Sequence, residues 1–294
     1  MTANLEQIDT VVRFHDVRRL TELKRCIFSL AGQTYRPLRI ILVLQRFTAA
    51  EAADTEAAIA PILEAEGAPA LRLIAWNGDG PTDARAALLN AGVAAANGRY
   101  IAFLDYDDVL YPGAYELLVA RLKRTGAAIA FAGLRTVELA VYERFSQPGI
   151  DVTPPFTGSG LADLFRHNFC PLHSYVIDRG RINAGALSFV PALTMEEDYD
   201  MLLRICAGYP SDFGLIGIPV GEYYFKTDGS NTVAAAGGLG AAARAHYERV
   251  IVPAIEYRRR ATLVAPEVQR GLGLAEVREP RSVRQAIDCL GSPV

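Results

Sequence analysis

The chain has 294 residues, of which 51% are hydrophobic and 21% are charged. This length allows one large domain, or a domain with an appendage, around a core of ordinary size. The formal net charge of -3 argues against a general polyanion binder, so we do not expect nucleic acid as a partner.

Four cysteines are spread along the chain without a CxxC pair. We therefore expect neither a disulfide framework nor a zinc site, and a reducing cytoplasmic location fits best. The first residues lack a basic-then-apolar signal pattern, and no stretch approaches the roughly 20 apolar residues of a membrane helix. We expect a soluble protein.

The first half of the sequence alternates apolar β-branched runs with segments of helical periodicity. Predicted strands cover residues 10–14, 39–44, 71–76 and 100–104, and predicted helices cover 20–30, 51–66, 83–97 and 112–125. Such alternation predicts an α/β fold with a mostly parallel central sheet flanked by helices. Ligands of such sheets bind outside the carboxyl ends of the strands, so the loops after residues 14, 44, 76 and 104 are expected to line one site.

The pattern is looser after residue 126. Short strands are predicted at 127–131, 134–142, 174–177, 213–218 and 221–225, with a Pro/Gly-rich loop at 148–160. Helices are predicted at 196–206 and, over a longer stretch, at 240–260, which leads us to expect a C-terminal helical extension. The basic cluster at 257–260 is interpreted as a solvated helix end, with contact to an anionic lipid or acceptor as the alternative.

An acidic cluster follows the fourth predicted strand. Asp105, Asp107 and Asp108 come directly after an apolar run, where adjacent carboxylates repel each other and need a counter-charge. Mg²⁺ or Mn²⁺ suits this role, because hard cations prefer carboxylate and phosphate oxygens and complete their shell with substrate phosphates. The alternative is that Asp107 or Asp108 caps the helix that follows.

Four segments in this order resemble motifs of the family 2 glycosyltransferases, which have the GT-A fold. Residues 28–35 resemble the segment "SL..QTY", 89–100 resemble "RNxGI..A.GxYI", 103–108 match "FLDxDD", and 197–204 match "EDYDLxLR". The resemblance spans roughly residues 10–232. It implies a GT-A domain at 1–235, with a nucleotide half at 1–125 and an acceptor half at 126–235, followed by the helical extension at 236–294.

The resemblance also implies roles for single residues. A metal ion, Mn²⁺ or Mg²⁺, would sit on Asp107, and Asp105 would hold the ribose or complete the metal's shell, with Tyr106 beside them in the donor site. Asp198 would be the general base of an inverting transfer. Glu197 and His173 would lie on the acceptor side. The residues alone leave two alternatives: residues 196–198 simply favour a helix N-terminus, and His173 is a structural or solvent-facing histidine, which is the interpretation they favour.

Several positions depart from the family pattern. The base-reading "DDGS" is replaced by residues 45–48, where Gln45 can hydrogen-bond a base edge. The segment 13–16 replaces "PTYN", so Phe14 and Asp16 are assigned to the donor site. The arginine of "RN" is lost, and Arg85 lies one helical turn earlier as a substitute cation. Two further positions stand near the family's late metal-binding histidine: Asp228 as a metal ligand, or Lys226 as a diphosphate contact.

Together these features predict a metal-dependent inverting glycosyltransferase. It would move a sugar from a nucleotide-diphosphate sugar to a glycan or glycolipid acceptor, in the synthesis of a surface polysaccharide or glycoconjugate. Peripheral contact with a membrane, or assembly with other glycan-synthesis enzymes, is considered as well. The lost "DDGS" motivates an alternative, a catalytically silent protein of the same fold that binds nucleotide sugars or acts as a scaffold.

Overall fold

Four parallel strands form the first half of the sheet. They are β1 (Ile8–Phe14), β2 (Leu38–Gln45), β3 (Ala70–Trp76) and β4 (Tyr100–Asp105), in the order β3-β2-β1-β4. The computed structural model describes residues 6–80, 82–142, 145–152, 157–227, 241–275 and 279–291. All four predicted strands of this half are confirmed, as is the parallel pairing that the alternation indicated.

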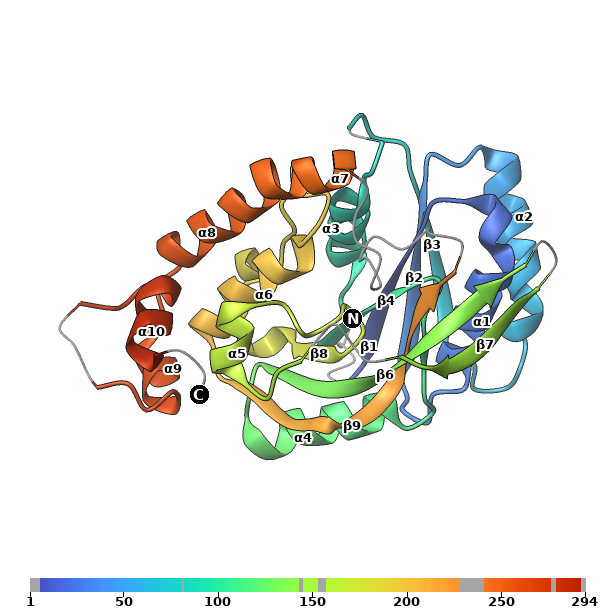
Figure 1. The fold of residues 1–294 in the computed structure, drawn as a ribbon. Helices are drawn as coiled ribbons and strands as arrows, with labels where there is room; N and C mark the ends of the chain where they lie inside the picture. Colours follow the sequence, from blue (N-terminus) through green and yellow to red (C-terminus); the bar gives the residue numbers. More distant parts are fainter. Residues whose placement is uncertain are drawn as a thin grey trace.

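Both faces of these strands are covered by helices, as their unbroken apolar runs require. Alternate residues Val11, Ile41 and Phe103 pack in the core on the side of α3 (Arg85–Ala95). Their neighbours in sequence pack against the other layer, formed by α1 (Leu20–Ala31), α2 (Ala49–Ile59) and α4 (Ala114–Thr125). Figure 1 shows these helices on the two sides of the sheet.

Helix α3 lies unusually close to the sheet at Gly92. A Cβ atom at this position would come within 2.3 Å of a Val11 methyl carbon on β1. The absence of a side chain at Gly92 therefore permits the close packing of α3 on β1.

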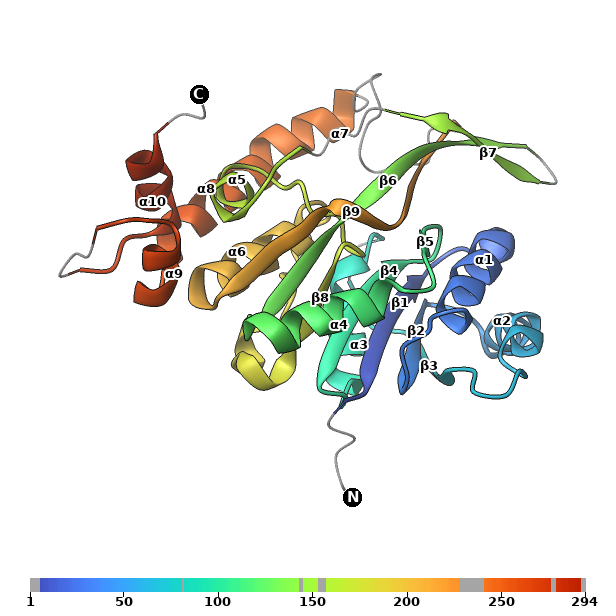
Figure 2. The ribbon, with the colours of Figure 1, turned by 90° about the horizontal axis from the view of Figure 1, so that it is seen from below.

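The second half extends the sheet with strands of mixed direction. The sheet continues from β4 to β8 (Tyr175–Asp178), β6 (Ile129–Val141), β9 (Ser211–Lys226) and β5 (Val109–Leu110). β8 is antiparallel to β4 and to β6, whereas β6 and β9 run parallel to each other over most of their length (Figure 2). The complete sheet is therefore mixed, and only the part formed by β1 to β4 is purely parallel.

The prediction of two short strand pairs in this region is wrong. Residues 129–141 and 211–226 each form one long strand, whose pairing register shifts at 130–135 instead of breaking. At Gly133 the two backbones approach so closely that a Cβ would lie 2.4 Å from the Ile216 carbonyl oxygen. Glycines that read as strand breaks thus allow irregular pairing inside a continuous strand.

A further strand replaces part of the predicted loop at 148–160. β7 (Ser146–Asp151) pairs antiparallel with β6 at the edge of the sheet (Figure 2). Pro148 is tolerated there because an edge strand needs no amide hydrogen on its outer side. Short α5 (Leu161–Arg166) follows, and α6 (Glu197–Gly208) forms the helix predicted at 196–206.

The C-terminal residues form the helical extension that the sequence predicts. α7 (Ala241–His246), a π-helical turn (Tyr247–Ile251) and α8 (Val252–Ala261) follow one another as a single rod, and α9 (Pro266–Gly271) and α10 (Val283–Leu290) complete the extension (Figure 1). No helix among the residues described is both long and apolar enough to cross a membrane.

The basic cluster at 257–260 is only partly a solvated helix end. Tyr257 and Arg260 are exposed. By contrast, Arg258 donates to Asp200 at 2.6 Å and Arg259 donates to the Tyr199 hydroxyl at 2.9 Å, so both fasten α8 to α6. The interpretation of all four residues as solvated is therefore wrong for the two in the middle.

Candidate active site

A cavity of about 810 Å³ opens at the carboxyl ends of β1, β2 and β4. The loops that follow these strands, and the start of α3, form one wall, as the parallel topology predicts. The first turn of α6 and the π-helical turn of the extension form the opposite wall. The charged residues of the lining are Arg13, Asp16, Arg18, Arg19, Asp83, Arg85, Asp105, Asp107, Asp108, Glu196, Glu197, Asp198 and Lys226.

The aspartates at the end of β4 and directly after it have different partners. Asp105 is the register partner of Arg13 across β1 and β4, and the Arg13 guanidinium contacts both of its oxygens, with Nε to Oδ1 at 2.7 Å and Nη2 to Oδ2 at 3.3 Å. Asp107 forms an ion pair with the Lys226 ammonium at the end of β9. The chain itself therefore supplies counter-charges to the two carboxylates that were expected to need a cation.

Asp108 serves the fold. It is 3% exposed, and its Oδ1 accepts the Tyr224 amide hydrogen of β9 at 3.0 Å, so it ties the turn after β4 to the neighbouring strand. Burial and the charges of Asp107 and Asp105 raise its pKa well above the ordinary value. For Asp105, burial works in the same direction but the charge and hydrogen bonds of Arg13 outweigh it, so its pKa is lowered and it stays ionised.

The donor atoms of the cavity suit a hard divalent cation. Asp105 and Asp107 both line the cavity, and their side chains keep 24% and 19% of their exposure. Eight carboxyl groups and five arginine and lysine side chains are among the described lining residues, so oxygen ligands are plentiful, while the pKa values of three of these carboxyls, Asp108, Glu196 and Asp198, are raised. In the described part of the chain no three potential ligands converge on one point. A cation would therefore take one or two carboxylates and complete its shell from substrate phosphates, which is the usual mode for Mg²⁺.

Three acidic residues open α6 on the opposite wall. Asp198 is half-buried, and its Oδ1 accepts the Tyr199 amide hydrogen at 2.7 Å and lies 3.4 Å from the Asn168 amide nitrogen. Burial, with the charges of Glu197 and Glu196, raises the pKa of Asp198 to about 8. A carboxyl with this pKa is poised between acid and base near neutrality, as general acid–base catalysis requires.

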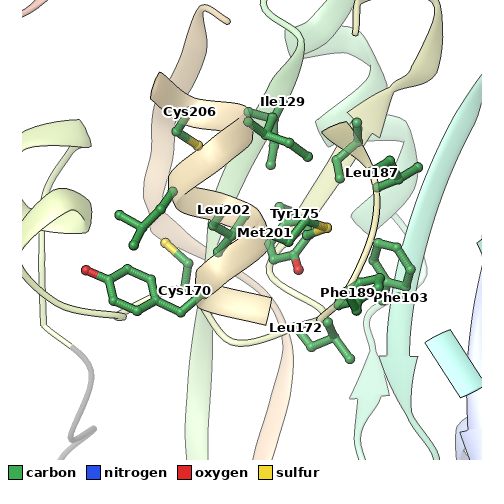
Figure 3. Close-up of a cluster of buried hydrophobic side chains, with 14 of the residues drawn as sticks. Phe103, Ile129, Cys170, Leu172, Tyr175, Leu187, Phe189, Met201, Leu202 and Cys206 are labelled. Atoms are coloured by element: carbon green, nitrogen blue, oxygen red, sulfur yellow. The ribbon is translucent and has the colours of Figure 1, made fainter. Parts of the chain in front are cut away.

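The backbone is strained at the residue before α6, and the helix that follows is anchored in the core. Glu196 precedes the helix with φ 59° and ψ 21°, a left-handed conformation that few residues other than glycine adopt. Further along the helix, Met201, Leu202 and Cys206 belong to the same buried core as Phe103 of β4, and Figure 3 shows Cys206 near Ile129 and Met201 near Tyr175. The hydrophobic face of α6 thus holds its acidic first turn in the cavity.

Most of the residues predicted for the donor and acceptor sites line this cavity. Asp16 is bonded to Arg18 at 2.8 Å, the Gln45 amide donates to the Thr82 carbonyl at 2.7 Å, and Arg85 is paired with Asp83 at 2.6 Å. The remaining members are Asp105, Tyr106, Asp107, Glu197, Asp198 and Lys226. Asp228 lies outside the described residues.

Two predicted site residues lie behind the cavity wall. Phe14 is fully buried and packs its ring against Tyr106 at 5.2 Å and Phe47 at 5.5 Å, so it supports the donor site without reaching it. His173 is 2% exposed, with Nε2 3.2 Å from the Glu222 carbonyl oxygen and Nδ1 3.4 Å from Asp108. Burial lowers its pKa to about 4, so it is neutral, and its predicted contact with an acceptor does not fit this position.

Sequence reasoning missed several polar residues of the cavity, Arg13, Asn168 and Tyr247 among them. Arg13 donates to Asp105 and, through Nη1, to Glu197 at 2.7 Å. Asn168 reaches both Glu196 and Asp198, and the Tyr247 hydroxyl contacts Glu196 at 3.3 Å from the C-terminal extension. Only Arg13 carried a visible signal, as a charged residue near the end of an otherwise apolar strand.

Comparison with known proteins matches this architecture to one family. The model of glycosyl transferase family 2 matches residues 14–175, from the last residue of β1 through β2, β3, β4 and the acidic cluster to the start of β8. The chain belongs to glycosyl transferase family 2. This family 2 chain is 32% identical to the succinoglycan biosynthesis protein ExoO of Rhizobium meliloti (strain 1021) over 185 residues, which cover 57% of the chain and 52% of that protein.

Other similarities are shorter or concern the fold alone. The chain is 36% identical to the uncharacterized glycosyltransferase YibD of Escherichia coli (strain K12) over 98 residues, 33% of the chain and 26% of that protein. The matched segments thus span about half of the first relative and a quarter of the second. The structure of S. aureus TarS 1–349 in complex with UDP-GlcNAc aligns with a TM-score of 0.58 at 12% identity, covering 89% of the chain and 68% of that TarS fragment. The complex of the same TarS fragment with UDP aligns at 0.51 with 11% identity, covering 74% and 60%. The fold is therefore the GT-A fold of these glycosyltransferases.

Proposed function

We propose that the chain is a metal-dependent, inverting glycosyltransferase that moves a sugar from a nucleotide-diphosphate sugar to an acceptor hydroxyl. One observation carries the proposal. A single cavity brings the Asp105 and Asp107 carboxylates at the ends of parallel strands together with Asp198, a carboxyl whose pKa suits a base. Membership of the family agrees with it.

In this reaction Asp198 takes the proton from the acceptor hydroxyl while the sugar's anomeric carbon leaves the diphosphate for that oxygen. Asp107, with Asp105, would hold Mn²⁺ or Mg²⁺. The bound cation supplies positive charge to the departing diphosphate. Arg85 and Lys226 line the same cavity and would add cationic contacts for phosphate oxygens.

The acceptor side is assigned to the wall around α6. Glu197 and Asp198 face the cavity there, and Tyr247 closes it from the extension. We propose a glycan or glycolipid acceptor in polysaccharide synthesis, because ExoO is a succinoglycan biosynthesis protein. We further propose a cytoplasmic location, since all four cysteines are free thiols and three of them are buried.

The test begins with donor binding. Thermal unfolding is measured with UDP, GDP, CDP and dTDP, each with and without Mn²⁺, and UDP sugars are tried first because a TarS structure contains UDP-GlcNAc. Transfer or hydrolysis of the preferred donor is then assayed for the wild type, for Asp198→Asn and for a control, Asp163→Asn on α5. We expect Asp198→Asn to bind nucleotide within about threefold of wild type and to lose about 10²- to 10⁴-fold in transfer. An unchanged transfer rate in Asp198→Asn would remove its role as base.

A catalytically silent donor-binding protein is the second candidate. It is favoured by the ion pairs that Arg13 and Lys226 make with Asp105 and Asp107, and by the neutral Gln45 where the family carries a base-reading aspartate. Nucleotide binding without turnover of any donor, with the same Mn²⁺ response in wild type and Asp107→Asn, would establish this alternative.

A further inference from the structure

Arg13 joins the two walls of the cavity. It lies near the end of β1, and its guanidinium donates through Nε and Nη2 to Asp105 at the end of β4 and through Nη1 to Glu197 in the first turn of α6. The two carboxylates are far apart in the chain, and Arg13 is hydrogen-bonded to both. Arg85 also lies within range of their charges, but its guanidinium is hydrogen-bonded to Asp83. The planar fork of an arginine can serve two carboxylates at once, which a lysine ammonium does less well.

This salt bridge lies in the cavity itself. Arg13 and Glu197 both line the cavity, and their side chains are 14% and 5% exposed, so the pair is shielded from water. Glu197 is the residue directly before Asp198. Fixing the carboxylate of Glu197 therefore fixes the strained turn that carries the proposed base, relative to the carboxylate proposed for the donor side.

We propose that Arg13 is a positioning residue, which sets the placement of the Asp198 turn against the donor site by holding Asp105 and Glu197 in one salt-bridged unit. This rests on the proposed transferase function. The loss of the bridge would leave nucleotide binding nearly intact and would slow transfer, because a base displaced by about 1 Å costs on the order of 10²-fold in rate.

The chain offers a matched control for a purely structural role. Arg39 on β2 is paired with Asp9 on β1 at 2.8 Å, and its side chain is 17% exposed. This pair lies at the opposite ends of the same strands, away from the cavity. Arg39→Met and Arg13→Met thus each remove one sheltered guanidinium from neighbouring strands, and only one of them touches the site.

The first measurement is steady-state transfer with the preferred donor. We expect Arg13→Met to lower kcat by about 10- to 100-fold with the nucleotide Kd within about threefold, whereas Arg39→Met keeps kcat within about twofold per folded molecule. Arg13→Lys should recover part of kcat, because its ammonium can still pair with one carboxylate. If Arg13→Met does not fold, Arg13→Lys and Glu197→Gln are judged by the same split between kcat and Kd.

The second measurement does not need turnover. Hydrogen exchange of the peptide spanning 196–206 should be faster, by about tenfold, in Arg13→Met and unchanged in Arg39→Met, because the first turn of α6 loses its anchor. A wild type that transfers no sugar would refute the proposed function, while this exchange experiment would still decide whether Arg13 holds α6. A kcat within threefold of wild type, or unchanged exchange at α6, in folded Arg13→Met would overturn the role assigned to Arg13.

Discussion

Asp198→Asn should stabilise the protein at neutral pH while it removes the proposed base. The asparagine keeps an oxygen that can accept the Tyr199 amide hydrogen, now at 2.7 Å, and it keeps the shape of the side chain. It cannot ionise. The difference in unfolding free energy between this variant and wild type therefore measures the cost of an ionised carboxyl beside Glu196 and Glu197 in this partly buried turn.

The sign follows from the direction of the pKa shift. The folded-state pKa of Asp198 is raised from 3.8 to about 8, so the favourable contribution of the protonated carboxyl is complete below pH 3.8. That contribution is lost as the pH rises toward 8, because the unfolded chain releases the proton and the native protein retains it. One pKa unit corresponds to about 1.4 kcal/mol, which gives an upper limit of about 6 kcal/mol over the window. Water that reaches the half-buried side chain screens the charge and brings the expected difference to about half of this.

The assay is urea unfolding of wild type and Asp198→Asn at several pH values between 5 and 9. The unfolding free energy of the variant minus that of wild type should grow steadily from pH 5 to about 8 and then level off. Most other groups titrate alike in both proteins and cancel in the difference. A difference that is constant between pH 5 and 8 would show that Asp198 ionises as an ordinary carboxyl, and it would refute the electrostatic account of the α6 turn.

Three further outcomes are expected. The transfer rate should rise about tenfold per pH unit below a plateau near pH 8, because Asp198 acts only without its proton, and a pH–rate profile flat from 6 to 9 would contradict this. Asp107→Asn should weaken nucleotide binding about tenfold or more in Mn²⁺ and little in EDTA, as titration calorimetry would measure; equal affinities in Mn²⁺ would argue against a metal at this residue. Gly92→Ala should cost about 1–3 kcal/mol in urea unfolding, because its methyl group would overlap Val11 and push α3 from the sheet; unchanged stability would mean that the helix shifts freely.

The parallel half of the sheet could be predicted from the sequence because each of its signals is local. An apolar run such as residues 39–44 reads as a buried strand whichever strand it pairs with, and the helices between strands impose parallel pairing. The long strands β6 and β9 lacked such a signal. Gly133 and Pro219 break the apolar pattern, and only the close approach of two strands far apart in the chain shows that the backbone continues through them.

The site residues likewise fall into a group that the sequence predicts and a group that it does not. That Asp105 and Gln45 face one cavity followed from the rule that the carboxyl ends of parallel strands share an edge, and Arg85 was assigned to it from the family resemblance. The partners of the carboxylates did not follow. Arg13 meets Asp105 because β1 and β4 are neighbours in register, and Lys226 meets Asp107 because β9 returns to β5 beside the acidic turn. Both pairs depend on strand order in space, which local periodicity does not encode.

The first turn of α6 combines features that each destabilise a fold. It carries three consecutive acidic residues, one of them in a left-handed conformation, and burial raises the pKa of both Glu196 and Asp198. Such local conflicts persist only where surrounding structure offsets them, and they concentrate at functional sites. Here the offsetting contacts come from the core beneath α6, from Arg13 on β1, which pairs with Glu197, and from the C-terminal extension, where Arg258 holds Asp200. The extension therefore has a physical reason to be part of the catalytic unit: without α8, the helix that carries the proposed base would keep its unfavourable charges and lose one of the three supports that hold them in the cavity.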